Sequence, residues 1–199
     1  MKVAIIKYNA GNIESVKNAV SRLGIVAEIT GDPVKIKNAD KVIFPGVGEA
    51  ANTMAYLRQK KLDELIVSLK QPVLGICLGL QLMCSQSEEG DTKCLGIFNE
   101  TVKRFRPVAG EEYITKVPHM GWNSVFELNS DLFSGIRENE YVYFVHSYFA
   151  GKGTDTAATC NYIIPFSAAL HKNNYYATQF HPEKSGTVGA AILKNFLEL

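Results

Sequence analysis

The amino-acid sequence predicts an α/β fold: a mixed, mainly parallel sheet flanked by helices, with additional antiparallel strands in the C-terminal half. Three observations lead to this prediction. Short buried-strand runs alternate with amphipathic stretches in the N-terminal half, as in parallel strands joined by crossover helices. After about Glu88 the strands become longer and more polar, which is typical of antiparallel pairing. The 199 residues show no repeat or linker, so residues 1–199 are expected to form a single domain.

The first predicted elements are a strand, a helix and a second strand. Residues 3–8 form the strand, and residues 9–12 (Asn-Ala-Gly-Asn) form a turn. Apolar residues then recur at helical spacing from Ile13 until Gly24, which offers a C-terminal cap. The next strand begins within residues 26–29.

The same order of elements then repeats along the chain. Residues 41–44 are an apolar strand, residues 45–48 (Pro-Gly-Val-Gly) are a turn, and a long helical region runs through residue 69. Residues 72–77 are a third central strand, followed by another turn and a helix.

The C-terminal half is predicted to contain strands and one closing helix. Two strands flank an Asn173-Asn174 turn as a hairpin. The predicted strands cover residues 141–149, 157–164, 168–171 and 175–180, and the helix covers residues 188–197.

The composition excludes several classes of protein. With 46% hydrophobic residues, 21% charged residues and a net charge of +1, the chain has neither the basic footprint of a nucleic-acid-binding protein nor an acidic tail. No apolar run is long enough for a signal-peptide core or a membrane span, so a cytoplasmic location is expected. The four cysteines include no C-x-x-C pair, so we expect neither a metal site nor a disulfide framework. No cofactor is expected either.

One cysteine lies in a context that predicts a nucleophile. Gly75-Ile76-Cys77-Leu78-Gly79 follows a buried strand and precedes a helix, the glycine-flanked elbow that presents a nucleophile on a tight turn. A helix N-terminus there would stabilise the thiolate. An arbitrary cysteine is more often a small buried hydrophobe, but the two glycines favour the nucleophile for Cys77. The other cysteines lack this context and are assigned to the core: Cys84, on the same predicted helix, Cys94 and Cys160.

A thiolate nucleophile needs a base, and His181 is the best candidate among four histidines. It follows the strand that ends at Phe180, and Pro182 then turns the chain so that Glu183 can reach the imidazole ring. A carboxylate there would hold the ring in the correct tautomer. Alternatively, His181 could be an ordinary surface histidine at the end of a strand. The Cys77 elbow favours the catalytic interpretation.

The tetrahedral intermediate of amide cleavage needs backbone donors for its negative charge. One is expected to be the N–H of Leu78, and the other to come from Gly46, Val47 or Gly48, in a turn that follows a parallel strand. Residues 46–51 also match the G-x-G-x-x-A dinucleotide fingerprint. The acidic residue expected after a further strand is missing there, so nucleotide binding is disfavoured.

In this order along the chain, the Pro45–Gly48 turn, the Cys77 elbow with Gln81, and His181-Pro182-Glu183 resemble the class I (triad) glutamine amidotransferases. The resemblance covers essentially the whole chain. It implies a flavodoxin-like, α/β-hydrolase-like fold, Cys77 as nucleophile, His181 as base and then acid, and Glu183 as orienter. Gln81 matches a position that helps to hold substrate glutamine, although by itself it would be an ordinary polar helix residue.

Further segments resemble one subfamily, the glutaminase subunits of imidazole glycerol phosphate synthase. They are residues 8–12, 118–123 (Pro-His-Met-Gly-Trp-Asn) and 145–148 (Val-His-Ser-Tyr). The resemblance implies a glutamine pocket lined by His146, Ser147 and Tyr148. It also implies a heterodimer with a cyclase subunit of the (β/α)₈-barrel type, which would be faced by Asn12, Pro118, Met120 and Trp122. By themselves, Trp122 could equally be a core aromatic residue and His146 a satisfied buried histidine.

The expected reaction is hydrolysis of L-glutamine to glutamate and ammonia through a cysteine thioester. The resemblance implies that the ammonia passes to the cyclase subunit, which forms imidazole glycerol phosphate and AICAR in histidine biosynthesis. Two alternatives stay open at this point. The same chemistry could serve a paralogous partner, such as a surface-sugar amidotransferase, or the chain could be a flavodoxin-like binding module with a reactive cysteine.

Overall fold

A computed structural model of the chain describes residues 1–8, 13–110 and 115–199. Its largest sheet has seven strands in the order β11-β12-β13-β4-β3-β1-β2. The five strands from β13 to β2 are parallel to one another, and β11 and β12 pair antiparallel at one edge. The strands are β1 Val3–Ile6, β2 Ala27–Thr30, β3 Lys41–Gly46, β4 Val73–Cys77, β11 Thr156–Tyr162, β12 Ile164–Lys172 and β13 Tyr175–Thr178. The predicted mixed, mainly parallel sheet is therefore confirmed.

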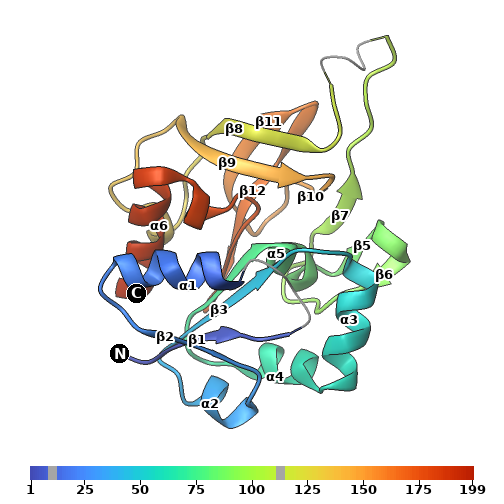
Figure 1. Cartoon of the computed structure of the whole chain (residues 1–199). Helices are drawn as coiled ribbons and strands as arrows, with labels where there is room; N and C mark the ends of the chain where they lie inside the picture. The colour runs from blue at the N-terminus through green and yellow to red at the C-terminus, as the bar shows by residue number, and fades with distance from the viewer. Residues whose placement is uncertain (9–12, 111–114) are drawn as a thin grey trace.

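Two smaller sheets stand beside the large one (Figure 1). One has the order β10-β7-β5-β6, and the other is the antiparallel pair β8-β9. Their strands are β5 Gln86–Ser87, β6 Thr92–Lys93, β7 Thr101–Arg104, β8 His119–Val125, β9 Glu140–His146 and β10 Tyr148–Ala150.

The faces of the large sheet carry two separate hydrophobic cores. One core packs against α1, α6 and the β8-β9 pair, and the other against α2, α3, α4 and α5. In Figure 1, α2, α3 and α4 lie across the sheet from α1. The helices are α1 Ile13–Arg22, α2 Pro33–Lys37, α3 Ala50–Gln59, α4 Leu62–Ser68, α5 Leu78–Met83 and α6 Gly186–Glu198. Three 3₁₀ turns complete the list: η1 Glu89–Asp91, η2 Asp131–Phe133 and η3 Pro182–Lys184.

Several predicted elements in the first half have different bounds. The long helical region before residue 69 is two helices, because Lys61 adopts a left-handed conformation with φ 54° between α3 and α4. Pro45 and Gly46 belong to β3 rather than to a turn, since they pair in register with Ile76 and Cys77. No turn separates β4 from α5, and α5 ends at Met83, so Cys84 follows that helix. The short helix α2 was not predicted.

The second half agrees more closely with the predicted elements. The β12-β13 hairpin turns at Asn173-Asn174, as expected, with Lys172 opposite Tyr175. The strand predicted over residues 141–149 is interrupted at Ser147 and contributes to two different sheets as β9 and β10.

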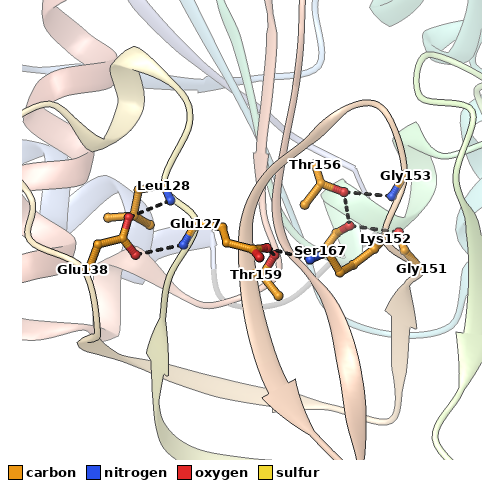
Figure 2. Close-up of polar contacts among 9 residues, drawn as sticks. All are labelled: Glu127, Leu128, Glu138, Gly151, Lys152, Gly153, Thr156, Thr159 and Ser167. Atoms are coloured by element: carbon orange, nitrogen blue, oxygen red, sulfur yellow. Dashed lines mark hydrogen bonds and ion pairs between the residues drawn. The ribbon is translucent and has the colours of Figure 1, made fainter.

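Polar contacts fasten the β8-β9 connection to β11 and to the loop before it, and β12 to the same loop (Figure 2). Glu127 accepts hydrogen bonds from Thr159 Oγ1 at 2.5 Å and from Lys152 Nζ at 2.6 Å. Glu138 accepts from the backbone N–H of Glu127 at 2.8 Å, and Ser167 donates to the Gly151 carbonyl at 2.8 Å. The small β8-β9 sheet is thereby held against the edge of the large one.

Within the described residues, no helix is both long and apolar enough to cross a membrane. The same part of the chain brings together no group of three or more His, Cys, Asp or Glu side chains that could hold a metal ion.

Candidate active site

Three neighbouring parallel strands end at one edge of the large sheet and bring the predicted residues together. Strand β4 lies between β3 and β13, and Gly46 at the end of β3 pairs in register with Cys77 at the end of β4. Strand β13 ends at Thr178, and the chain then runs through Gln179 to His181. Ligands of parallel α/β sheets characteristically bind at this edge.

Cys77 forms the junction between β4 and α5. It caps the helix N-terminus with φ 55° and ψ −108°, a strained conformation for a residue with a side chain. Its glycine neighbours are required by packing: a Cβ on Gly79 would lie 2.0 Å from the Phe44 carbonyl oxygen, and one on Gly75 would lie 2.7 Å from Met83 Sδ. The predicted elbow is present. The other three cysteines are buried in the core, as predicted.

His181 and Glu183 form a buried pair beside the cysteine. His181 Nδ1 lies 2.8 Å from Glu183 Oε1, and both side chains are almost wholly inaccessible. Burial disfavours the charged ring, but the nearby Cys77 sulfur and the hydrogen-bonded Glu183 carboxylate outweigh burial and raise the pKa of His181 to about 10. The ring is therefore held as an imidazolium between an acid and a sulfur.

A cavity of about 470 Å³ opens in front of Cys77. Most of the residues that the sequence predicted for the active site line this cavity. Its lining includes Val47, Gly48, Cys77, Leu78, Gln81, Pro118, His146, Ser147, Tyr148 and His181. Gly46 and Glu183 do not line it. Gly46 lies beneath it, where a Cβ would stand 3.0 Å from Leu78 Cβ, and Glu183 lies behind His181.

The glutamine and histidine side chains around this cavity are joined by hydrogen bonds. Gln81 Nε2 donates to the Tyr148 carbonyl at 2.8 Å and to Gln179 Oε1 at 3.1 Å, and Gln179 Nε2 approaches Cys77 Sγ at 3.8 Å. Burial lowers the pKa of His146 to about 3, so that its ring is neutral. His146 is thus both a hydrogen-bonded buried histidine and part of the cavity wall.

Sequence reasoning missed three residues near Cys77. Gln179 stands in the segment that carries His181, but nothing local marks it as a contact of Cys77. Glu89 and Lys184 also line the cavity. Glu89 accepts a hydrogen bond from the Ala50 backbone N–H at 2.7 Å, and burial raises the pKa of its carboxyl group. The position of Lys184, one residue after Glu183, was the only available signal for it.

The residues expected to face a partner lie on β8 and beside it. Met120 is 63% exposed and Trp122 is 55% exposed, so the alternative of a core aromatic residue at Trp122 is wrong. Pro118 lines both the cavity of Cys77 and a larger groove that Met120 also lines. Asn12, the fourth predicted partner residue, lies outside the described residues.

Comparisons with known proteins agree with this geometry. The family described as glutamine amidotransferase class-I matches residues 4–199. The chain is 63% identical to the imidazole glycerol phosphate synthase subunit HisH of Bacteroides fragilis (strain YCH46) and 44% identical to that of Escherichia coli (strain K12). Each match covers the whole of both chains. A solved glutamine amidotransferase has a TM-score of 0.74 at 18% identity, covering 98% of this chain and 97% of its own, and shows the same fold.

Proposed function

From the premise that this chain belongs to the class-I glutamine amidotransferase family, we propose that Cys77, His181 and Glu183 are its catalytic residues. The chain is the glutaminase subunit of an imidazole glycerol phosphate synthase and acts in histidine biosynthesis. One observation carries the catalytic assignment: the strained Cys77 at the β4-α5 junction shares a cavity with His181, whose ring is paired with buried Glu183.

In the proposed reaction, the Cys77 thiolate attacks the side-chain amide carbon of glutamine. The N–H of Leu78 and a backbone N–H of the Val47-Gly48 segment, which line the same cavity, take the negative charge of the tetrahedral intermediate. His181 gives its proton to the departing nitrogen, so that ammonia leaves and a γ-glutamyl thioester remains. His181 then removes a proton from water, which attacks the thioester, and glutamate is released.

The cavity also suits the charged end of a free amino acid. Glutamine carries an α-amino cation and an α-carboxylate anion, and the cavity wall contains the carboxyl group of Glu89 and the amino group of Lys184. We propose that Glu89 faces the amino group and Lys184 the carboxylate. His146, Ser147, Tyr148 and Gln81 would then surround the side chain that is cleaved.

The chain works in a complex with a cyclase subunit. We propose that this subunit is a (β/α)₈ barrel that docks on the β8 face. Two observations support the location. Met120 and Trp122 are large exposed apolar side chains, and Pro118 lines both the cavity of Cys77 and the groove beside Met120. Ammonia released beside Pro118 could then enter the partner before water protonates it, for use in forming imidazole glycerol phosphate and AICAR.

The test is nitrogen transfer from amide-labelled glutamine in the assembled complex with the cyclase subunit. Cys77→Ala should lower glutamine hydrolysis by about 1000-fold or more, because no other group can form the thioester. Cys84→Ala is the matched control, since Cys84 is buried in the core outside the cavity, and it should retain turnover. Full turnover by Cys77→Ala in the complex would overturn the nucleophile assignment.

A further inference from the structure

Gln179 occupies an unusual position behind the nucleophile. Its side chain is completely buried, and its amide lies between Cys77 and Gln81. Gln179 Nε2 is 3.8 Å from Cys77 Sγ, and Gln179 Oε1 accepts from Gln81 Nε2 at 3.1 Å. The reaction derived above makes no use of this residue.

The direction of these hydrogen bonds follows from one backbone carbonyl. The Tyr148 carbonyl can only accept, so the Gln81 atom 2.8 Å from it must be the nitrogen. The second hydrogen of that nitrogen points to Gln179, so the Gln179 atom that accepts it must be the amide oxygen. The nitrogen of Gln179 is then left facing the sulfur, and a flipped Gln179 amide would oppose two donors on one side and leave the sulfur facing an oxygen.

The Tyr148 carbonyl is itself held by a second donor. His146 Nδ1 lies 2.7 Å from it and must carry a proton, because the carbonyl accepts. The neutral His146 ring then accepts at Nε2 from His119 Nδ1, 3.1 Å away. His119 is also buried, and its ring stacks on Tyr162 at 3.9 Å between centroids. The Tyr148 carbonyl thus accepts from His146 on one side and from Gln81 on the other, and the remaining Gln81 hydrogen fixes the orientation of the Gln179 amide beside Cys77.

We propose that Gln179 is a positioning residue for the nucleophile, whose Nε2–H donates to the Cys77 sulfur and holds it as a thiolate aimed into the cavity. The inference rests on the proposed function, because it concerns the same sulfur. A donor on the sulfur stabilises negative charge there. On the other side of the sulfur lies the Val145 carbonyl, 4.0 Å away, which can accept from the thiol but not bind the thiolate. Gln179 thus favours the reactive form.

Two variants separate the two halves of the Gln179 amide. Gln179→Glu keeps an oxygen for Gln81 and replaces the N–H that faces Cys77 with a second oxygen. Gln179→Met has a similar length and offers neither group. Thr178→Val is the matched control, because the adjacent Thr178 is equally buried and its hydroxyl donates to the Phe180 carbonyl at 3.1 Å, away from the sulfur.

The experiment measures alkylation of Cys77 by iodoacetamide against pH in the assembled complex, with the modified residue identified by peptide mass spectrometry. We expect the alkylation rate of Gln179→Glu at neutral pH to fall about tenfold, equivalent to about 1.4 kcal/mol, and its profile to move to higher pH. The alkylation rate of Gln179→Met should lie between the rates of Gln179→Glu and the wild type. In glutamine hydrolysis, kcat should fall about tenfold with a much smaller change in KM, and Thr178→Val should match the wild type in both assays.

Thermal melting of the same samples shows whether each variant is folded. If Gln179→Met does not fold, Gln179→Glu alone is used for the test, because it retains a hydrogen-bond acceptor for Gln81. Normal glutamine hydrolysis by the wild type together with unshifted alkylation profiles in the folded variants would overturn this inference alone. A wild-type complex that alkylates rapidly but hydrolyses no glutamine would overturn the proposed function and this inference with it.

Discussion

At the scale of single residues, the buried acid beside His181 decides the charge of the active site. Glu183 accepts from His181 Nδ1 at 2.8 Å, and its side chain is fully inaccessible. A carboxylate removed from water acts on a neighbouring ring with little screening. Together with Cys77 it overcomes the burial that would otherwise keep the His181 ring neutral.

Glu183→Gln should therefore flatten the dependence of stability on pH. Because the pKa of His181 is raised to about 10 in the folded protein and is about 6.5 in an unfolded chain, the stability contributed by the protonated ring is complete below about pH 6.5. It is lost as the pH rises toward about 10. Urea unfolding in reducing buffer at several pH values across this window should show a smaller decline for Glu183→Gln than for the wild type.

Glu64→Gln is the matched control for that series, since Glu64 is an exposed acid on α4. Its free energy of unfolding should follow the wild-type curve across the window. Parallel curves for Glu183→Gln and the wild type would contradict the pairing of Glu183 with a charged ring.

The sequence predicted that Cys77, His181 and Glu183 lie together, as they do in the structure, but it did not predict the residues that surround them. Cys77, His181 and Glu183 stand in short local motifs. The glycines and the proline in these motifs indicate the backbone conformation that the three residues require. Gln179 was missed because its contacts with Cys77 and Gln81 span 102 and 98 residues of chain. Such a contact depends on strand order, which no local pattern reveals.

At the scale of elements, the β4-α5 junction positions Cys77, the proposed nucleophile. Helix α5 begins directly at Cys77 and passes so close to β3 that Gly79 touches the Phe44 backbone. The close approach places the free N–H groups of the first helical turn next to the sulfur. Packing between α5 and β3 therefore fixes the position of the nucleophile.

Gly79→Ala should destabilise the fold by about 1–3 kcal/mol or more, because the added Cβ would meet a backbone oxygen at 2.0 Å and neither side can rotate away. Gly151→Ala is the control: its nearest atom would be the Thr101 carbonyl oxygen at 4.0 Å, and the cost should be within about 0.5 kcal/mol. Urea unfolding of both variants checks the difference. Equal stabilities would show that α5 can move away from β3.

Hydrophobic periodicity identified most of the long elements and failed at short or polar ones. Helix α2 has five residues, too few for a recognisable period. The break between α3 and α4 falls at Lys60-Lys61, where neither glycine nor proline signals a left-handed residue. Strand β8, with its run of polar and glycine residues, was recognised only as a motif.

At the scale of the whole molecule, the protein exposes apolar side chains on the same side as its catalytic cavity. Strand β8 directs His119 inward, toward His146, and Met120 and Trp122 outward. The polar cluster of Glu127, Thr159 and Lys152 holds this small sheet in place (Figure 2). One short strand thus connects the proposed partner face to the network that ends at the nucleophile.

Trp122→Ala should weaken binding of the cyclase subunit by about tenfold or more, since exposed tryptophans that become buried are frequent anchors of interfaces. The stability of the isolated chain should change little, because the ring is already half exposed. Titration calorimetry with the purified cyclase subunit measures the affinity. Val26→Ala, which removes part of an 87% exposed side chain on another edge, should bind as the wild type does.

An unchanged affinity of Trp122→Ala would place the partner elsewhere on the molecule. The sequence predicted that Trp122 belongs to a partner surface only through a resemblance, and its exposure was not predictable from hydropathy. The strand order was likewise not predictable, because β13 enters the sheet next to β4 from the far end of the chain.

That strand order has a consequence for synthesis on the ribosome. The nucleophile is translated with the first half of the chain, whereas β13, which carries the base to its side, is among the last segments to emerge. A growing chain that has folded only its N-terminal strands holds Cys77 without His181, Glu183 or Gln179. By the proposed mechanism, the fold therefore completes the group that activates the sulfur only when translation is almost finished.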